Sequence, residues 1–321
     1  MGHRWGAPVR IRVPATSANL GPGFDALGLA LTLYDEVEAR VTEGGLTIEV
    51  TGEGADLADA GENHLVVRAM RAAFGELGRQ PPGLALRCVN RIPHGRGLGS
   101  SAAAIVAGIL AARALAASGP AGEATSPAAA LPLATRLEGH PDNVAAALLG
   151  GLTIAWDTRA VRLEPLEAIR PVAIIAQDPV RTDVARGLLP DQVPHQDAAF
   201  NSGRSALLVA ALTSSPEALL DATADRLHQD YRAKAMPATY DLVTRLRAAG
   251  VPAVVSGAGP SVLAFTGAVD QVTAIVDSTV EETGTAWSIS PLDVARHGAS
   301  IMSASPTRGS DCDAGTSSSG R

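Results

Sequence analysis

The stretch IPHGRGLGSSAAA, residues 92–104, places three glycines and two serines directly before the apolar run IVAGILAARALAAS. Gly95, Gly97 and Gly99 lack Cβ atoms, so the backbone there can bring its N–H groups close to a bound anion. A helix predicted from Ser101 to Ala117 adds its free N–H groups and the positive end of its dipole. The loop and the helix together predict a phosphate-binding cradle that needs no lysine.

The same loop admits a plainer interpretation. No Lys-Ser or Lys-Thr pair follows the last glycine, so the Walker pattern is not met, and the Rossmann pattern fails as well. A Gly-rich turn in which Ser100 caps the helix would explain the residues without a ligand. In the phosphate interpretation, the hydroxyls of Ser100 and Ser101 add donors, or one of them ligates Mg²⁺.

A second unusual stretch, PATSANLGPGFDALGLAL, occupies residues 14–31. Short polar side chains, among them Asn19, precede a Gly-Pro-Gly turn and the carboxylate of Asp25. Apolar residues follow, so Asp25 is expected at the rim of a buried segment, where it would suit a ligand's ammonium group. The alternative is an aspartate that caps a helix.

A third stretch, RLEGHPDNVAAALLGG (residues 136–151), gathers four polar side chains within six positions. Glu138 could complete a Mg²⁺ site with a loop serine, and Asp142 or Asn143 could contact a nucleophilic hydroxyl. His140 is the fourth member of the group. The group contains neither an HExxH pair nor cysteine ligands, so its spacing does not fit zinc. A polar turn that caps the next helix is the alternative.

Three further features are weaker on their own. The run VSGAGPSVLAF, residues 255–265, predicts a glycine turn between two apolar strands, which either closes over a ligand or is a tight hairpin. Arg186, in RTDVARGLLP, and Arg232, in DYRAKAM, could each bind a carboxylate through the guanidinium fork. Most surface arginines have no such specific role.

Composition narrows the class of protein. The 321 residues are 46% hydrophobic and 3% aromatic, and the net charge is −7. An acidic chain with few aromatic residues disfavours nucleic acid as the partner. No apolar run reaches the length of about 18 residues that a membrane span needs, and MGHRWGAPVR lacks the features of a signal peptide. We therefore expect a cytoplasmic protein with no membrane partner, and its two cysteines do not suggest a disulfide framework.

The order of predicted elements favours an α+β fold, because strands and helices do not alternate as regular βαβ units. VRIRVPATSA predicts a strand that stops at Pro14, and AAALPLATRLEG predicts a helix after Pro132. SPEALLDATADRLHQDYRAKA is expected to be largely helical. The expected domains are residues 1–165 and 166–302, followed by a Ser- and Gly-rich tail, 303–321, that is expected to be disordered.

PATSANLGPGFDALGLAL, the glycine loop and VSGAGPSVLAF, in this order, resemble the three signature motifs of the GHMP kinase superfamily. EGHPDN and TDVARGLLP make the chain similar to its homoserine kinase branch. The resemblance runs from about Val9 to about Gly298. It implies a two-domain fold, with an N-terminal ATP-binding domain like ribosomal protein S5 domain 2 and a ferredoxin-like C-terminal domain. It also implies transfer of the γ-phosphate of ATP to the hydroxyl of L-homoserine, a step of threonine biosynthesis.

The resemblance implies roles for the residues of the motifs. The expected nucleotide-binding residues are Asn63, near the adenine, and Pro93, His94, Gly95, Arg96, Gly97, Leu98, Gly99, Ser100 and Ser101, around the phosphates. The expected Mg²⁺ ligands are Ser101 and Glu138. The expected substrate-binding residues are Asn19, Asp25, His140, Arg186, Arg232, Gly257 and Gly259, with Asp25 on the ammonium group and the arginines on the carboxylate. The expected residues at the reacting groups are Asn143, Asp142 and Thr182, although no dedicated base is required.

Several points stay open in this interpretation. Glu138 and His140 are two positions apart, closer than in some members of the superfamily, so Glu138 could point away from the metal. His94 and Arg96 either help to bind phosphate or are only solvated. A mevalonate-type kinase and a non-catalytic ligand-binding relative are the alternative functions, although mevalonate lacks an ammonium group for Asp25. A homodimer is one expected assembly.

Overall fold

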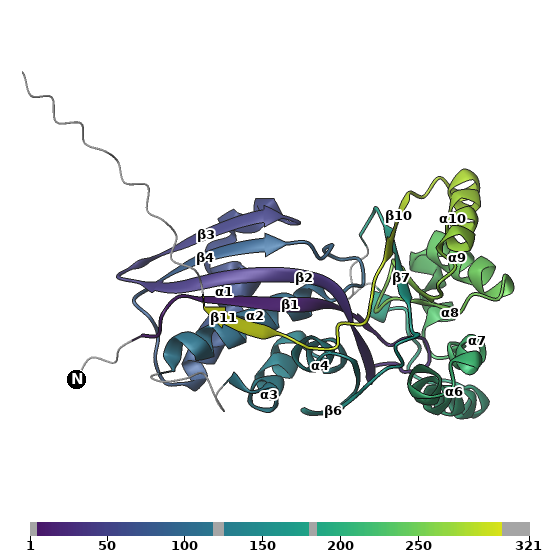
Figure 1. Cartoon of the computed structure of the whole chain (residues 1–321), viewed down its shortest axis with the longest axis horizontal. Helices are drawn as coiled ribbons and strands as arrows, with labels where there is room; N and C mark the ends of the chain where they lie inside the picture. The colour runs from purple at the N-terminus through teal and green to yellow at the C-terminus, as the bar shows by residue number, and fades with distance from the viewer. Residues whose placement is uncertain (1–4, 118–124, 180–184, 304–321) are drawn as a thin grey trace, which may run out of the picture.

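The structure is a computed structural model that describes residues 5–117, 125–179 and 185–303. It forms two sheets side by side, each with its own helices (Figure 1). Thr182 and nearly all of the expected tail, residues 304–321, lie outside the described residues. In the described part of the chain, no helix is both long and apolar enough to span a membrane.

The first sheet has the strand order β11-β1-β2-β4-β3, and β5 pairs with both β2 and β6. Its strand pairs are antiparallel except β3 and β4, which run parallel. The strands are β1 (Val9–Ala18), β2 (Leu27–Thr42), β3 (Gly45–Gly52), β4 (Gly83–Asn90), β5 (Leu152–Trp156), β6 (Arg159–Leu163) and β11 (Ser300–Ser303).

The helices of the first half lie together against one face of this sheet (Figure 1). They are η1 (Ala55–Asn63), α1 (Leu65–Glu76), α2 (Ser100–Ala116), α3 (Pro127–Glu138) and α4 (Asp142–Leu149). Helix α2 is the central one, because 12 of its 17 residues are buried. At Gly108, a Cβ would lie only 2.5 Å from the carbonyl oxygen of Val66, so this glycine lets α1 and α2 approach closely.

The second sheet has the order β10-β7-β9-β8, and all its pairs are antiparallel. Its side chains alternate between two faces: Ala173 and Leu263 share a core with α6, whereas Ile174 and Val262 pack with α9 and α10. The elements are β7 (Pro171–Ala176), α6 (His195–Thr213), η3 (Pro216–Ala218), α7 (Leu219–Ala222), α8 (Gln229–Arg232), η4 (Ala233–Ala235), α9 (Pro237–Ala248), β8 (Ala253–Val255), β9 (Val262–Phe265), α10 (Val269–Thr283) and β10 (Trp287–Pro291).

Two predicted element boundaries were wrong, both at prolines. β1 does not stop at Pro14, because a register shift between Pro14 and Ala15 lets the strand continue to Ala18. Helix α3 begins before Pro132, at Pro127, where the Ser126 hydroxyl accepts a hydrogen bond from the Ala129 amide. A serine cap followed by proline starts a helix strongly enough to carry it through the later proline.

After β10 the chain returns to the first sheet. β11 pairs antiparallel with β1, from Val9 opposite Ser303 to Arg12 opposite Ser300. On the way, the Ala295 amide bonds to the Ala30 carbonyl and the Ala299 amide bonds to the Ala147 carbonyl. The expected domain boundary at residue 165 does not predict this return, because it assigns the whole segment after β10 to the C-terminal domain.

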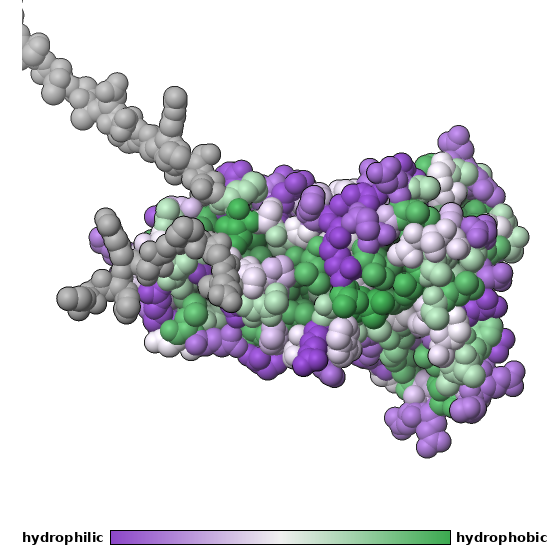
Figure 2. Space-filling view, turned by 60° about the horizontal axis from the view of Figure 1, so that its bottom comes forward, coloured by the Kyte–Doolittle hydropathy of each residue, from purple (hydrophilic) through white to green (hydrophobic). Residues whose placement is uncertain are grey.

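In Figure 2, apolar residues gather near the middle of the molecule, with polar residues around them.

Candidate active site

The glycine loop leads directly into α2, which begins at Ser100. Its N-cap residue is Gly99, which has a φ of 72° and offers no side chain to the helix amides. The interpretation of Ser100 as a helix cap is therefore wrong. The Ser101 hydroxyl donates to Glu138 Oε2 at 2.7 Å instead. The N–H groups at the start of α2 thus have no side-chain cap and can bind an anion.

The third glycine motif holds the loop in place. A Cβ on Gly97 would lie 2.1 Å from the Ser256 carbonyl oxygen, so only glycine fits this contact. The Ser256 hydroxyl lies 2.7 Å from the Gly97 carbonyl oxygen and 2.8 Å from the hydroxyl of Ser17. The turn after β8 is therefore part of the hairpin of β8 and β9 and also supports the loop; its closure over a ligand stays a prediction.

Arg96 has a structural function that the sequence did not indicate. Its guanidinium donates to the carbonyl oxygens of Ala176 at 3.0 Å, Gln177 at 2.5 Å and His94 at 2.7 Å. These bonds tie the glycine loop to the end of β7, in the second sheet. Arg96 is thus not simply solvated, and a contribution of its remaining N–H groups to phosphate binding stays a prediction.

Two cavities meet at the start of α2, where Ser100 and Ser101 line both of them. The first has about 640 Å³ of free space, part of it open to solvent, and is lined by Asn19, Gly95, Gly97, Gly99, Ser100, Ser101, Glu138, His140, Asp142, Asn143, Arg186, Arg232, Gly257 and Ala258. The second has about 930 Å³ of free space, also partly open to solvent, and is lined by Asp35, Val37, Leu57, Ala60, Asn63, His64, Leu65, Val66, Asn90, His94, Ser100, Ser101, Ala103, Ala104 and Ala107. The expected adenine residue and the expected substrate residues therefore lie in adjoining spaces.

Some expected residues do not line either cavity. Leu98 is buried in the core, and its carbonyl oxygen accepts from the Thr16 amide at 3.0 Å. A Cβ on Gly259 would collide with the sulfur of Met236, so this glycine packs against a side chain. Pro93 and Asp25 are also absent from the lining residues, although Asp25 reaches the first cavity through its partner, Arg186.

Glu138, His140 and Asp142 form an acidic group on one wall of the first cavity. His140 Nδ1 lies 2.7 Å from Asp142 Oδ1. Burial of the His140 ring opposes its protonation, but the hydrogen bond to Asp142 and the charges of Asp142 and Glu138 together outweigh burial and raise the pKa of His140. Burial also raises the pKa of Glu138, against the hydrogen bond from Ser101. Glu138 lines the cavity despite its closeness to His140 in the sequence.

The partners of Asn143 and Asp142 decide what each presents to a ligand. Thr16 Oγ1 donates to Asn143 Oδ1 at 2.8 Å, which commits the amide oxygen and leaves its NH₂ group as a donor. Asp142 Oδ1 accepts from the Asn143 amide at 2.7 Å, whereas its buried Oδ2 has no hydrogen-bond partner in the described residues. The wall therefore offers one donor and one acceptor side by side. Sequence reasoning missed the function of Thr16, although its motif was singled out.

Asp25 and Arg186 bind each other in this structure. Arg186 Nη1 lies 3.0 Å from Asp25 Oδ2, and Nη2 lies 2.6 Å from Oδ1, so the pair is bidentate. This bond and the charge of Asp25 raise the pKa of Arg186 against burial. Each partner keeps free sites, since a guanidinium has five N–H groups and a carboxylate four lone pairs. Asp25 is not a helix cap, because the segment after it begins strand β2.

Asn19 is largely committed to the backbone. With a φ of 66°, it donates from Nδ2 to the Gly257 carbonyl oxygen at 2.9 Å and accepts at Oδ1 from the Asp25 amide at 2.9 Å. One N–H of its amide is left for a ligand. Asn19 thus joins the first motif to the third and fixes the backbone of Asp25.

Arg232 is a buried cation that has no carboxylate within ion-pair distance among the described residues. Its side chain is 1% exposed. Its polar contacts are His228 Nδ1 at 3.2 Å and the carbonyl oxygens of Ala185 at 3.3 Å and Gly257 at 3.4 Å. Burial, followed by the charge of Arg186, lowers its pKa to about 10. A buried cation without an anionic partner is costly, so this position favours an anionic ligand.

The donor set of the site fits Mg²⁺ better than a transition metal. In the parts of the chain that the structure describes, no group of three or more His, Cys, Asp and Glu residues could hold a metal by itself. Ser101 and Glu138 offer two adjacent hard oxygen ligands. Mg²⁺ commonly takes one or two protein ligands and completes its shell with water and phosphate oxygens.

Comparisons with known proteins agree with this geometry. A family model described as GHMP kinases N terminal domain matches residues 64–151, and one described as GHMP kinases C terminal matches residues 207–282. The homoserine kinase of Streptomyces coelicolor is 57% identical over 302 residues, which cover 92% of this chain and 95% of the relative. The homoserine kinase of Clavibacter michiganensis is 50% identical over 302 residues, which cover 92% and 95%.

Solved structures show the same likeness. The crystal structure of homoserine kinase from Cytophaga hutchinsonii superposes with a TM-score of 0.79 at 27% identity, covering 92% of this chain and 97% of that one. A crystal structure of mevalonate kinase shares the fold, with a TM-score of 0.65 at 13% identity, covering 90% and 99%. The chain belongs to the GHMP kinase family. Within that family it belongs to the homoserine kinases, as its identity to the curated relatives shows.

Proposed function

We propose that this enzyme transfers the γ-phosphoryl group of ATP to the side-chain hydroxyl of L-homoserine and forms O-phospho-L-homoserine, within threonine biosynthesis. Its membership of the homoserine kinases supports the activity. The observation that carries the proposal is Arg232, a buried guanidinium in the cavity beside the glycine loop that has no carboxylate partner among the described residues. An amino-acid carboxylate is a ligand that would satisfy it.

The charged residues of the cavity would orient the amino acid. Arg232 and the free N–H groups of Arg186 would bind the carboxylate, and the remaining lone pairs of Asp25 would accept the ammonium group. A zwitterion needs opposite charges at a fixed separation, and the Asp25–Arg186 pair supplies both beside Arg232. The side-chain hydroxyl would then lie toward Asn143 and Asp142. Such positioning is the largest part of catalysis in phosphoryl transfer.

The nucleotide would occupy the second cavity, with its phosphates over the start of α2. The apolar side chains of Leu65 and Val66 suit a base, and Asn63 offers it an amide. The free amides from Gly95 to Ser101 would bind the phosphates. Ser101 and Glu138 would hold Mg²⁺, which when bound neutralises charge on the transferred group.

Asp142 would accept the proton of the hydroxyl. Asp142 Oδ2 is buried and has no partner in the described residues, and it lines the same cavity as Asn143. Asn143 would donate from its amide to the attacking oxygen or to a phosphate oxygen, since Thr16 occupies its carbonyl. A strong base is not required when the transition state is loose, so Asp142 needs only to accept the proton as the bond forms.

The alternatives make different demands on these residues. A mevalonate-type substrate carries no ammonium group and would leave Asp25 without a ligand. A non-catalytic relative would bind nucleotide or amino acid without turnover, yet the glycine loop and the polar wall are both intact. The cytoplasmic location and the homodimer expected from the sequence stay predictions.

A substrate panel tests the proposed function. We expect ADP release with ATP, Mg²⁺ and L-homoserine, and little release with mevalonate, galactose or threonine. Arg232→Lys keeps the charge but loses the guanidinium fork, so the KM for homoserine should rise by roughly tenfold to a hundredfold. The KM for ATP should stay within about threefold of the wild-type value. Turnover of mevalonate or galactose in place of homoserine would overturn the proposal. Equal changes in the KM values for homoserine and ATP would show that Arg232 does not bind the substrate carboxylate.

A further inference from the structure

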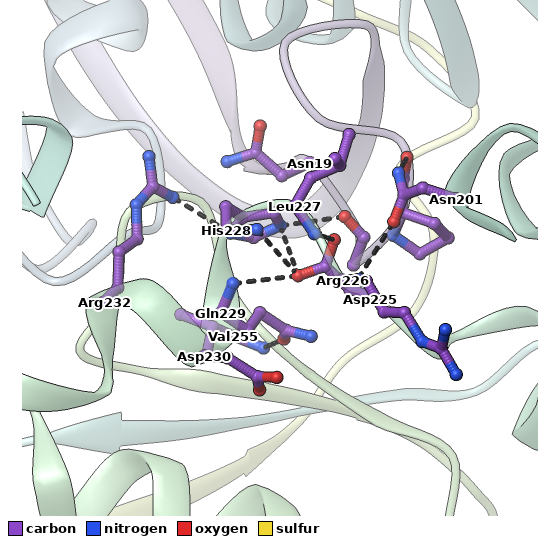
Figure 3. A network of polar contacts seen from close by, with 12 residues as sticks. Asn19, Asn201, Asp225, Arg226, Leu227, His228, Gln229, Asp230, Arg232 and Val255 are labelled. Carbon is purple, nitrogen blue, oxygen red and sulfur yellow. Dashed lines mark hydrogen bonds and ion pairs between the residues drawn. The ribbon is translucent and has the colours of Figure 1, made fainter. Parts of the chain in front are cut away.

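His228 lies at the centre of a buried polar network beside Arg232 (Figure 3). The side chain is fully buried, with Nδ1 3.2 Å from Arg232 Nη1 and Nε2 2.8 Å from the Gly21 carbonyl oxygen. A guanidinium can only donate hydrogen bonds and a carbonyl oxygen can only accept them. The two partners therefore require a neutral ring that carries its proton on Nε2 and a lone pair on Nδ1.

The charged groups around the ring agree with a neutral state. Burial lowers the pKa of His228, and the charge of Arg232 acts in the same direction. Asp225 and Asp25 favour the protonated ring, but Asp225 Oδ2 lies 3.7 Å from Nε2, beyond a good hydrogen bond. The oxygens of Asp225 accept from backbone amides instead.

The backbone that carries His228 is fixed from two sides. Asp225 accepts from the amides of Leu227 at 3.0 Å, His228 at 3.1 Å and Gln229 at 2.8 Å. Gln229 Oε1 accepts from the Val255 amide at 2.6 Å, which ties the segment to β8 (Figure 3). A ring held this firmly can fix the position of a longer and more flexible side chain beside it.

Among the described residues, His228 is the side chain that forms a hydrogen bond with Arg232, at 3.2 Å. The other two partners of Arg232 are the backbone carbonyl oxygens of Ala185 and Gly257, at 3.3 and 3.4 Å. The ring also joins Arg232 to Gly21, in the loop that carries Asn19 and Asp25. One side chain thus links the groups proposed for the carboxylate and for the ammonium group.

We infer that His228 is a positioning residue: its Nδ1 lone pair aims the Arg232 guanidinium at the carboxylate of the amino-acid substrate, and its Nε2–H anchors the pair to Gly21. This inference rests on the proposed function. The competing interpretation is that His228 only fills space beside Phe24, whose ring centroid lies 5.2 Å away.

Two substitutions separate these interpretations, because each keeps one nitrogen position of the ring. His228→Asn can place an acceptor where Nδ1 lies, whereas His228→Gln can place a donor where Nε2 lies. We expect His228→Gln to raise the KM for homoserine by roughly tenfold or more, since a hydrogen bond to a charged group is lost. His228→Asn should raise it by less than about threefold, and both should leave the KM for ATP near the wild-type value. His195→Gln, at an exposed histidine, is the matched control and should change neither KM value.

A spectroscopic measurement covers the case in which a variant does not fold. Nitrogen-15 NMR of the wild-type histidines should show His228 neutral and protonated on Nε2 at neutral pH and at mildly acidic pH. A charged ring, or a proton on Nδ1, overturns the inference. Equal effects of the two substitutions on the KM for homoserine, or parallel losses for homoserine and ATP, overturn it as well. If the wild-type enzyme does not use homoserine, the proposed function fails, while the tautomer still reports on the network.

Discussion

At the scale of single residues, the partner of each polar atom decides what that residue can do in the reaction. Asn143 and Asp142 are neighbours in the sequence, yet the bond from Thr16 makes Asn143 a donor, whereas Asp142 is an acceptor because its Oδ2 has no partner among the described residues. The sequence identified both positions but could not assign these functions. The sequence could not predict the structural function of Arg96 for the same reason, because its three carbonyl partners come from residues distant in the chain or from the backbone of its own loop.

The proposed function of Asp142 predicts a defect in turnover. Asp142→Asn keeps the shape of the side chain and an acceptor for the backbone N–H of Asn143, but it cannot take a proton from the substrate hydroxyl. We expect kcat to fall roughly a hundredfold, the lower range for loss of a proton acceptor, with the KM for homoserine within about threefold. The pKa of His140 should also fall, because Asp142 raises it in the wild type.

Steady-state kinetics over a range of pH checks this prediction. Asp157→Asn, at an exposed aspartate in the turn between β5 and β6, is the control and should match the wild type. A kcat for Asp142→Asn within about threefold of the wild-type value would mean that the reaction proceeds without this acceptor.

At the scale of elements, the start of α2 shows how one backbone position supports the site. Gly99 has a φ of 72°, and a Cβ there would lie 2.0 Å from Thr16 Oγ1 and 3.2 Å from Asn143 Oδ1. A side chain at this position would therefore strain the backbone and also displace the hydrogen bond that orients Asn143. Gly284, the C-cap of α10, has almost the same φ, 71°, but no atom within 4 Å of a Cβ.

These two glycines allow strain to be separated from collision. Gly284→Ala should lose about 1–2 kcal/mol of stability from the left-handed conformation, and Gly99→Ala should lose more, because its Cβ also collides with Thr16. Only Gly99→Ala should also lose kcat, by roughly tenfold or more, because Asn143 loses its orienting partner. Urea unfolding and initial rates under saturating substrates would measure both effects. Equal kcat values for the two variants would show that the Thr16–Asn143 contact does not matter for turnover.

Most elements could be predicted from local sequence, and the exceptions have physical causes. The α+β class is confirmed, and the helix predicted from Ser101 to Ala117 is α2, one residue earlier. The segment expected to be largely helical, residues 215–235, is helical in short pieces, with a break at residues 223–228 that the sequence did not predict. The Asp225 carboxylate takes three backbone amides in that segment, and such side chains compete with helix formation. Helical spacing of apolar residues gives no sign of this competition.

At the scale of the whole molecule, the site depends on contacts between segments far apart in the chain. The motifs themselves were identifiable, and so was their order. The contacts between them were not, because Ser256 lies 159 positions from Gly97 and Asn19 lies 238 from Gly257. The return of β11 to β1 has the same origin: a strand of four residues has no local signal for a partner almost the whole chain away.

The buried histidines predict how the stability of the whole molecule depends on pH. Burial lowers the pKa of His64 and His228 below the usual 6.5, with the charges of His94 and Arg232 acting in the same direction. Their contribution to stability is therefore present above pH 6.5 and is lost as the pH falls through the folded-state pKa values. Asp142 raises the pKa of His140 despite burial, so its contribution is present below pH 6.5 and is lost as the pH rises through its folded-state pKa. Because these trends are opposite, the summed contribution of the three histidines to the free energy of unfolding is largest near pH 6.5.

Urea unfolding between about pH 5 and about pH 8 tests this expectation, with His64→Asn as the informative variant. Asparagine is a favourable N-cap residue, and His64 occupies the N-cap of α1 without a side-chain cap, so the variant should fold. The variant lacks one group that takes up a proton on unfolding. Its free energy of unfolding should therefore fall less steeply than that of the wild type as the pH is lowered, and the two slopes should differ by up to about 1.4 kcal/mol per pH unit. His297→Asn, at an exposed position, should follow the wild type. If His64→Asn also follows the wild type at every pH, His64 is not held neutral by the fold, and the acid side of the curve must come from other groups.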